Sequence, residues 1–221
     1  MPKQTFFNLP PEKRDKIIDI AIEEFASHTY SKASLSRIVA KAGIAKGSMY
    51  QYFEDKKDLF KHILNLAVQE KINYIEKYGI NKGDDFFSAF EKTMLAGTQF
   101  SLEHPYIGKI FANAMEPTSE EILKDLNAKW RPMSLKFFED LIEKGKSEGS
   151  IRQEANARLV SHMLVSLLGV GLTDYLLEKL GISMDDFFYD TSQVQKLAPE
   201  ELQRIIKDIM DFIRNGLGSK G

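Results

Sequence analysis

A cluster of basic, hydroxyl and amide side chains between residues 32 and 57 could bind the phosphate groups of nucleic acid. Six basic residues stand there against two acidic ones, whereas the whole chain has a net charge of −2. Lys46, Tyr50 and Gln51 bring such groups together, and Gly47 allows close approach. Ammonium and hydroxyl groups donate hydrogen bonds to phosphate oxygens. The pattern predicts a basic DNA-binding face on an acidic body; the alternative is a chance cluster of charges on a solvated surface.

Residue types used in catalysis are present, but their spacing does not favour an enzyme. The histidines are scattered and form no pair with metal-ligand spacing on a helix: His28, His62, His104 and His162. Ser161, His162 and Asp174 have the types of a catalytic triad, but neighbouring positions on one helix point apart. The chain has no cysteine, which excludes disulfides and thiolate metal sites. We therefore expect no enzymatic activity, no metal ion and no cofactor.

The elements that must position the basic cluster are helices. Apolar residues recur at helical spacing along almost the whole chain, and no segment alternates as a strand would. This predicts an all-α fold: an N-terminal three-helix helix-turn-helix domain, followed by a larger helical-bundle domain. We place the first domain at residues 1–57, with the start of the long linking helix at about 56–78, and the second at residues 58–221.

Capping signals mark where the helices begin and end. In the first domain we expect helices from Pro10 and Pro11 to about His28, from the cap Ser34 to Gly43, over residues 46–53, and from the cap Asp55 to about Tyr78. In the second we expect helices at about 85–103, 105–113, 119–148, 156–180 and 199–217. Residues 181–198 are less regular, with a short packed helix containing Met184, Phe187, Phe188 and Tyr189, and residues 218–221 form a frayed tail.

Two short helices joined by a tight glycine-containing turn can place the second helix in the major groove of DNA. Residues 35–59 read LSRIVAKAGIAKGSMYQYFEDKKDL, which closely resembles the DNA-binding signature of the TetR (tetracycline-repressor-like) family. The ordered string of alanine-glycine turn, Lys-Gly-Ser, aromatic residues, acidic residue and lysine carries this resemblance. It covers about the first quarter of the chain, whereas the rest matches only in length, helical character and layout. One departure is Val39, where many members have alanine.

The resemblance implies which residues contact DNA. The phosphate contacts it implies are Lys46, Tyr50, Tyr52 and Lys56. The groove-facing positions are Ser36, Gly47, Ser48 and Gln51, and Arg37 fits either role. The alternatives are that Tyr50 and Tyr52 pack on the first helix and that Lys56 is a solvated cap.

The second domain is rich in methionine and aromatic residues, which line adaptable apolar cavities but also form ordinary cores. The resemblance implies that this helical bundle is a ligand-binding and dimerisation domain with an effector cavity. The candidate pocket residues are Phe90, Met94, Phe111, Met115, Trp130, Met133, Phe137, Met163, Leu167 and Tyr175. Helix 156–180 is apolar almost all round and helix 199–217 has a wide apolar stripe, so the resemblance implies a four-helix dimer interface. Its candidates are Leu164, Leu168, Ile205, Ile209 and Phe212, and the alternative is a thick monomer core.

We therefore expect a homodimeric repressor that binds a palindromic double-stranded DNA operator and is released by a small, largely apolar effector. The N-terminus has no signal-peptide pattern. The most apolar stretch, residues 163–172, has about half of the roughly 20 residues that a membrane span needs. We expect a cytoplasmic protein, associated with the nucleoid through its operator and without membrane contact. The rival hypothesis is a helical carrier or enzyme for an apolar small molecule, with a vestigial N-terminal unit.

Overall fold

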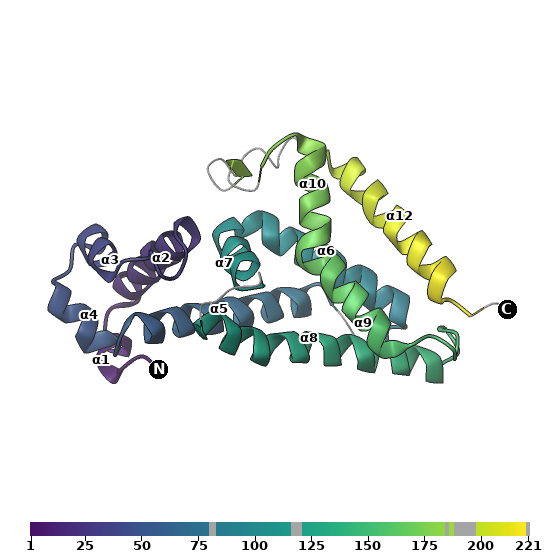
Figure 1. The fold of residues 1–221 in the computed structure, drawn as a ribbon, viewed down its shortest axis with the longest axis horizontal. Coiled ribbons are helices and arrows are strands. Elements are labelled where there is room, and N and C mark those ends of the chain that lie inside the picture. The colour runs from purple at the N-terminus through teal and green to yellow at the C-terminus, as the bar shows by residue number, and fades with distance from the viewer. Residues whose placement is uncertain (80–82, 116–120, 184–185, 188–197, 220–221) are drawn as a thin grey trace. The chain divides into compact units, whose positions relative to one another are not determined.

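The computed structural model describes residues 1–79, 83–115, 121–183, 186–187 and 198–219. Helices account for the regular structure of these residues, and their extended pairing is a single bridge between Ile151 and Gly218. The predicted all-α fold is confirmed (Figure 1). The chain divides into two compact units, residues 1–71 with 106–126 and residues 72–105 with 127–221.

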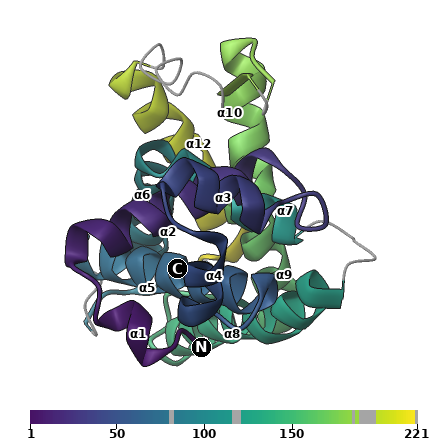
Figure 2. The ribbon, with the colours of Figure 1, turned by 90° about the vertical axis from the view of Figure 1, so that its left-hand side faces the viewer.

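The first unit contains the predicted helix-turn-helix. Its helices are α1 (Gln4–Phe7), α2 (Pro11–Ser27), α3 (Leu35–Ala42), α4 (Lys46–Tyr52), α7 (Pro105–Met115) and the first part of α5 (Lys56–Lys77). The predicted caps are confirmed, because the Ser34 hydroxyl accepts the Arg37 N–H and Gly43 has a left-handed φ of 70° at the end of α3. Figure 2 shows the first unit from its N-terminal side, with α3 and α4 joined by a short turn.

Apolar side chains from successive helices hold the first unit together. Ile17 of α2, Ile38 of α3 and Met49 of α4 are each 1% exposed. The Phe25 ring of α2 lies 4.7 Å from the Phe60 ring of α5. Burial of such side chains, about 1.5–3 kcal/mol each, stabilises a helix as short as α4, which would not persist alone.

The second unit has its own core. Its helices are the end of α5, α6 (Phe86–Glu103), most of α8 (Glu121–Ser147), α9 (Ala157–Ser166), the π-helical turn η1 (Leu167–Gly171), α10 (Leu172–Leu180) and α12 (Pro199–Leu217). Phe86, Phe90, Met94 and Ile142 are fully buried in it. Helix α12 contacts α6.

The structure departs from the predicted elements at three places. The four-residue helix α1 was not predicted. The predicted helix 156–180 contains the π-helical turn η1. The tail does not fray at its start, because Arg152 and Ser219 donate backbone hydrogen bonds to Leu217 and Ser150 beside the bridge at Gly218. In the predicted helix after residue 181, Phe187 is buried, and Met184, Phe188 and Tyr189 lie outside the described residues.

Candidate nucleic-acid interface

Helix α4 has one face inside the protein and one face in solvent. Met49 is 1% exposed and anchors the inner face, whereas Tyr50 is 46% exposed. Lys46, Gly47 and Gln51 are also exposed. The outer face therefore presents an ammonium, a phenol and an amide, which can bind phosphate oxygens and base edges.

The remaining predicted groove-facing residues lie beside this surface. Ser36 is exposed on α3, and Ser48 is half-buried near the start of α4. Val39, which departs from the family pattern, is 6% exposed, so its larger side chain is accommodated in the packing of α3.

Arg37 joins α3 to α2 instead of standing free. Its Nε atom donates to the two carboxylate oxygens of Glu24 at 3.0 and 3.1 Å, and a terminal nitrogen donates to the Lys32 carbonyl at 2.8 Å. Glu24 also accepts the Ser34 N–H at 2.8 Å. Burial opposes the ionisation of Glu24, but the hydrogen bonds from Arg37 and Ser34 and the nearby charges outweigh it and lower the pKa of Glu24. Arg37 therefore holds the beginning of α3.

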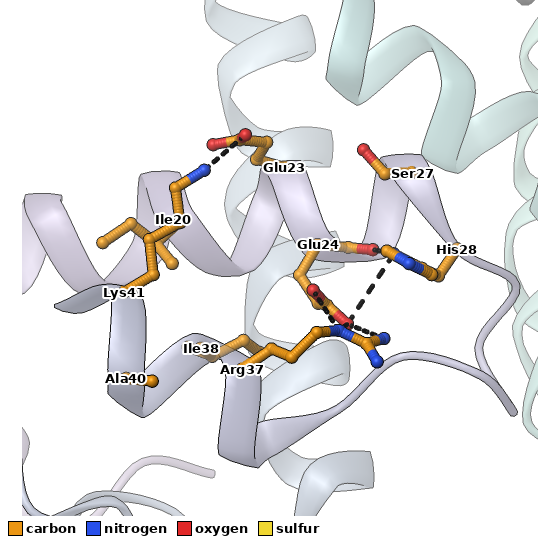
Figure 3. Close-up of a pocket in the computed structure, with 9 residues that line it drawn as sticks. All are labelled: Ile20, Glu23, Glu24, Ser27, His28, Arg37, Ile38, Ala40 and Lys41. Atoms are coloured by element: carbon orange, nitrogen blue, oxygen red, sulfur yellow. Dashed lines mark hydrogen bonds and ion pairs between the residues drawn. The ribbon is translucent and has the colours of Figure 1, made fainter.

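An open hollow of about 420 Å³ lies between α2 and α3 beside this contact (Figure 3). Its walls are formed by Ile20, Glu23, Glu24, Ser27, His28, Arg37, Ile38, Ala40 and Lys41. Lys41 forms an ion pair with Glu23 and Arg37 forms one with Glu24. The charged groups of the hollow thus pair with one another across the two helices.

Lys56 is engaged with the loop between α2 and α3. Its ammonium donates to the carbonyl oxygens of Tyr30, Ser31 and Ala33 at 2.7, 3.2 and 3.1 Å and lies 4.6 Å from the centre of the Tyr30 ring. The two roles predicted for Lys56 are a phosphate contact and a solvated cap. Each of them requires a side chain that faces solvent. The structure instead gives this ammonium three internal acceptors, which the sequence did not reveal.

Tyr52 differs from its predicted outward position. It is 7% exposed, and its ring lies 6.0 Å from the ring of Phe6. The alternative considered for Tyr52 was packing on the first predicted helix; its observed ring partner belongs to the unpredicted helix α1. Tyr50, in contrast, is 46% exposed.

The candidate pocket residues of the second domain do not share one environment. Phe90 and Met94 are fully buried in the core. Leu167 packs at the edge of that core, and Trp130 is half-buried. Four candidates are 44–58% exposed: Met133, Phe137, Met163 and Tyr175. The side chains of Phe111 and Met115 lie outside the description. These residues lie on helices that are apolar on several faces. The sequence pattern of such a helix does not show which face points inward, so it could not separate the buried candidates from the exposed ones.

The candidate dimer residues divide in the same way. Leu164 and Ile205 are 3% and 7% exposed and belong to the core of the second unit, so they face inward instead of toward a partner. Leu168 and Ile209 are partly buried at the edge of that core. Phe212 is 75% exposed on α12 and has the environment expected of an interface residue.

Two further features bear on the predicted chemistry. Among the residues that the structure describes, no three histidine or acidic side chains gather as a metal site would require. In the same part of the chain, no helix is both long and apolar enough to cross a membrane.

Comparison with known proteins identifies this arrangement. Residues 17–63 match the model of the bacterial regulatory proteins of the tetR family. A solved TetR family transcriptional regulator from Chloroflexus aurantiacus J-10-FL superposes with a TM-score of 0.79 at 30% identity, with all of both chains covered.

Two curated relatives extend the match beyond the helix-turn-helix. The HTH-type transcriptional repressor BepR of Brucella suis biovar 1 (strain 1330) is 24% identical over 187 residues, which cover 78% of this chain and 85% of the relative. The fatty acid metabolism regulator protein of Bacillus subtilis (strain 168) is 22% identical over 172 residues, covering 75% and 86%. The chain therefore belongs to the TetR family of DNA-binding transcription regulators and is not an enzyme.

Proposed function

We propose that the protein is a repressor that binds a palindromic operator as a homodimer, with α4 of each subunit in the major groove. The observation that carries this proposal is the polar outer face of α4, where Lys46, Tyr50 and Gln51 are exposed while Met49 anchors the helix from below. A single unit of this size offers few base contacts, so a two-fold dimer must supply two half-sites. The Brucella relative is itself named a repressor.

The proposed DNA contacts fall into two groups. Lys46 and Tyr50 bind phosphate oxygens, and Ser36, Gly47, Ser48 and Gln51 face the groove. The side chains of Arg37, Tyr52 and Lys56 contact Glu24, Phe6 and the Tyr30 carbonyl. In this proposal they support the DNA-binding surface and do not contact DNA themselves.

The dimer contact is proposed on the outer face of α9, α10 and α12. Four large apolar side chains of these helices are 49–75% exposed: Leu159, Met163, Tyr175 and Phe212. Large contiguous apolar patches mark interaction surfaces, and we propose that these side chains form one. Their exposure supports a self-association surface that includes Phe212 from the predicted set and Met163 and Tyr175 from the predicted pocket.

Control by a small, largely apolar effector is proposed for the second unit. Helix α5 runs from Lys56, next to the DNA-binding helices, to Lys77, and the boundary between the two units falls within it, between residues 71 and 72. A change of tilt in α5 would alter the distance between the two α4 helices of a dimer. Because the spacing of successive major grooves is fixed, such a change would weaken DNA binding. The name of the Bacillus relative connects that protein with fatty acid metabolism, which agrees with an apolar effector.

The experiment for repression is DNase footprinting on the DNA upstream of the chain's own gene, with transcription in vitro from the same fragment. We expect two symmetric protected half-sites and less transcript as protein is added. A scrambled fragment of equal length and composition is the control. Equal protection of both fragments, or more transcript with protein, contradicts the proposal.

Effector control has a separate test by calorimetry. A candidate apolar effector is titrated into the protein with and without operator DNA. Linkage requires the operator to weaken effector binding by the same factor by which the effector weakens operator binding, typically 5–150-fold. Equal effector affinities in both titrations contradict control by that ligand, and the rival function, a carrier of apolar molecules, then gains support.

A further inference from the structure

The C-terminal end of α4 has hydrogen-bond partners from the beginning of the chain. The last four carbonyl groups of a helix have no partner within it. In α4 the Met49 carbonyl accepts the Phe53 N–H at 2.8 Å. The next three carbonyls are bound by only two residues near the N-terminus.

These two residues are Lys3 and Thr5. The Lys3 ammonium donates to the Tyr50 carbonyl at 2.7 Å, and the Lys3 N–H donates to the Tyr52 carbonyl at 2.8 Å. The Thr5 hydroxyl donates to the Gln51 carbonyl. The Lys3 charge is also favourable there, because the C-terminal end of a helix carries a partial negative charge.

Phe6 anchors this segment to the protein. It is 2% exposed, and its ring lies 4.8 Å from the Phe53 ring and 5.7 Å from the His62 ring. The three contacts to α4 are thus held by a buried side chain, although Lys3 and Thr5 are exposed. Figure 2 shows α1 below α4 in the first unit.

We propose that Lys3, Thr5 and Phe6 are positioning residues for operator recognition, which keep α4 folded and aimed before DNA binds. Helix α4 has seven residues, too few to be stable alone. Tyr50 and Gln51, whose carbonyls are bound, also carry two of the exposed side chains proposed to contact DNA. The apparent affinity of a protein is proportional to the fraction of its molecules that are in the binding-competent state. The inference rests on α4 being the helix that reads DNA.

The test compares the wild type with Thr5→Val and Phe6→Leu, with any purification tag at the C-terminus. Thr5→Val removes a hydroxyl and no charge. One neutral hydrogen bond changes an equilibrium by about fivefold, so we expect operator affinity to fall measurably, by at most about 25-fold over two half-sites. The slope of affinity against salt concentration should not change, because no phosphate contact is lost. Gln4→Ala is the matched control, since it removes an exposed hydrogen bond to Asn8 within the same segment.

Hydrogen–deuterium exchange of the free variants provides a readout without DNA. We expect faster exchange of the α4 amides in Thr5→Val and Phe6→Leu and wild-type exchange in Gln4→Ala. Unchanged exchange overturns the proposal, and so does faster exchange with unchanged operator affinity. If Lys3→Met alone lowers affinity and flattens the salt slope, Lys3 is a phosphate contact and the proposal fails. A wild-type protein that does not bind the palindrome contradicts the proposed function instead, and exchange then tests the positioning role by itself.

Discussion

The Lys56 ammonium at the start of α5 lies 2.7 Å from the carbonyl oxygen of Tyr30, in the loop that joins α2 to α3. The same ammonium binds the carbonyls of Ser31 and Ala33 and lies over the Tyr30 ring. A lysine that looks like a phosphate contact in the sequence therefore fastens the loop that leads into the helix-turn-helix.

Replacing Lys56 by methionine should lower the free energy of unfolding and leave the salt dependence of DNA binding nearly unchanged. Hydrogen bonds to a charged group contribute about 1.5–3 kcal/mol, so we expect the free energy of unfolding to fall by about that amount in urea titrations. Lys61→Met, at an exposed position of α5, should change it little. If the salt slope of DNA binding falls by about one unit per subunit in Lys56→Met, Lys56 contacts a phosphate and this prediction is wrong.

Replacing Glu24 by glutamine should remove part of the pH dependence of stability. The pKa of Glu24 is lowered from its ordinary value of 4.5, because the bonds from Arg37 and Ser34 outweigh its burial. A carboxylate with a lowered pKa stabilises the fold above the unfolded pKa, and this contribution is lost as the pH falls through the folded pKa. Glu24→Gln should therefore be less stable than wild type at pH 7, and the difference should shrink as the pH falls below about 4.5. A difference that stays constant in denaturant titrations across this range would contradict the assignment.

Phe212→Asp should dissociate the dimer while leaving the subunit folded. Phe212 is 75% exposed, so the new carboxylate stays in water in the monomer but would be buried without a partner in a dimer. Analytical ultracentrifugation should show monomers, with the helical circular dichroism of the wild type. Leu66→Asp, at a position 42% exposed on α5, is the control and should remain dimeric. A dimeric Phe212→Asp protein would place the interface elsewhere.

The sequence predicted elements that depend on local signals and missed contacts between distant residues. Ser34 and Gly43 marked the ends of α3 correctly, since caps are local. Lys3 and Tyr50 are 47 positions apart, and the sequence around either residue does not indicate their contact. For Met163, the helical pattern indicated burial but could not distinguish a pocket, a core or a partner, and the residue is 58% exposed.

Lys46→Ala should weaken binding to every DNA sequence alike. Its ammonium is exposed at the start of α4, and loss of a phosphate contact removes counterion release without removing sequence information. Fluorescence anisotropy at several salt concentrations should show a slope lower by about one unit per subunit. A slope equal to that of the wild type would remove Lys46 from the interface.

Gln51→Ala tests most directly the claim that the outer face of α4 reads the operator. The measurement is the ratio of affinities for the palindromic operator and for a scrambled duplex, determined by anisotropy at one salt concentration. A lost base contact costs about 1–3 kcal/mol, so we predict that operator affinity falls about 5- to 150-fold per half-site while affinity for the scrambled duplex stays the same. An unchanged ratio in Gln51→Ala would contradict base reading by this face of α4.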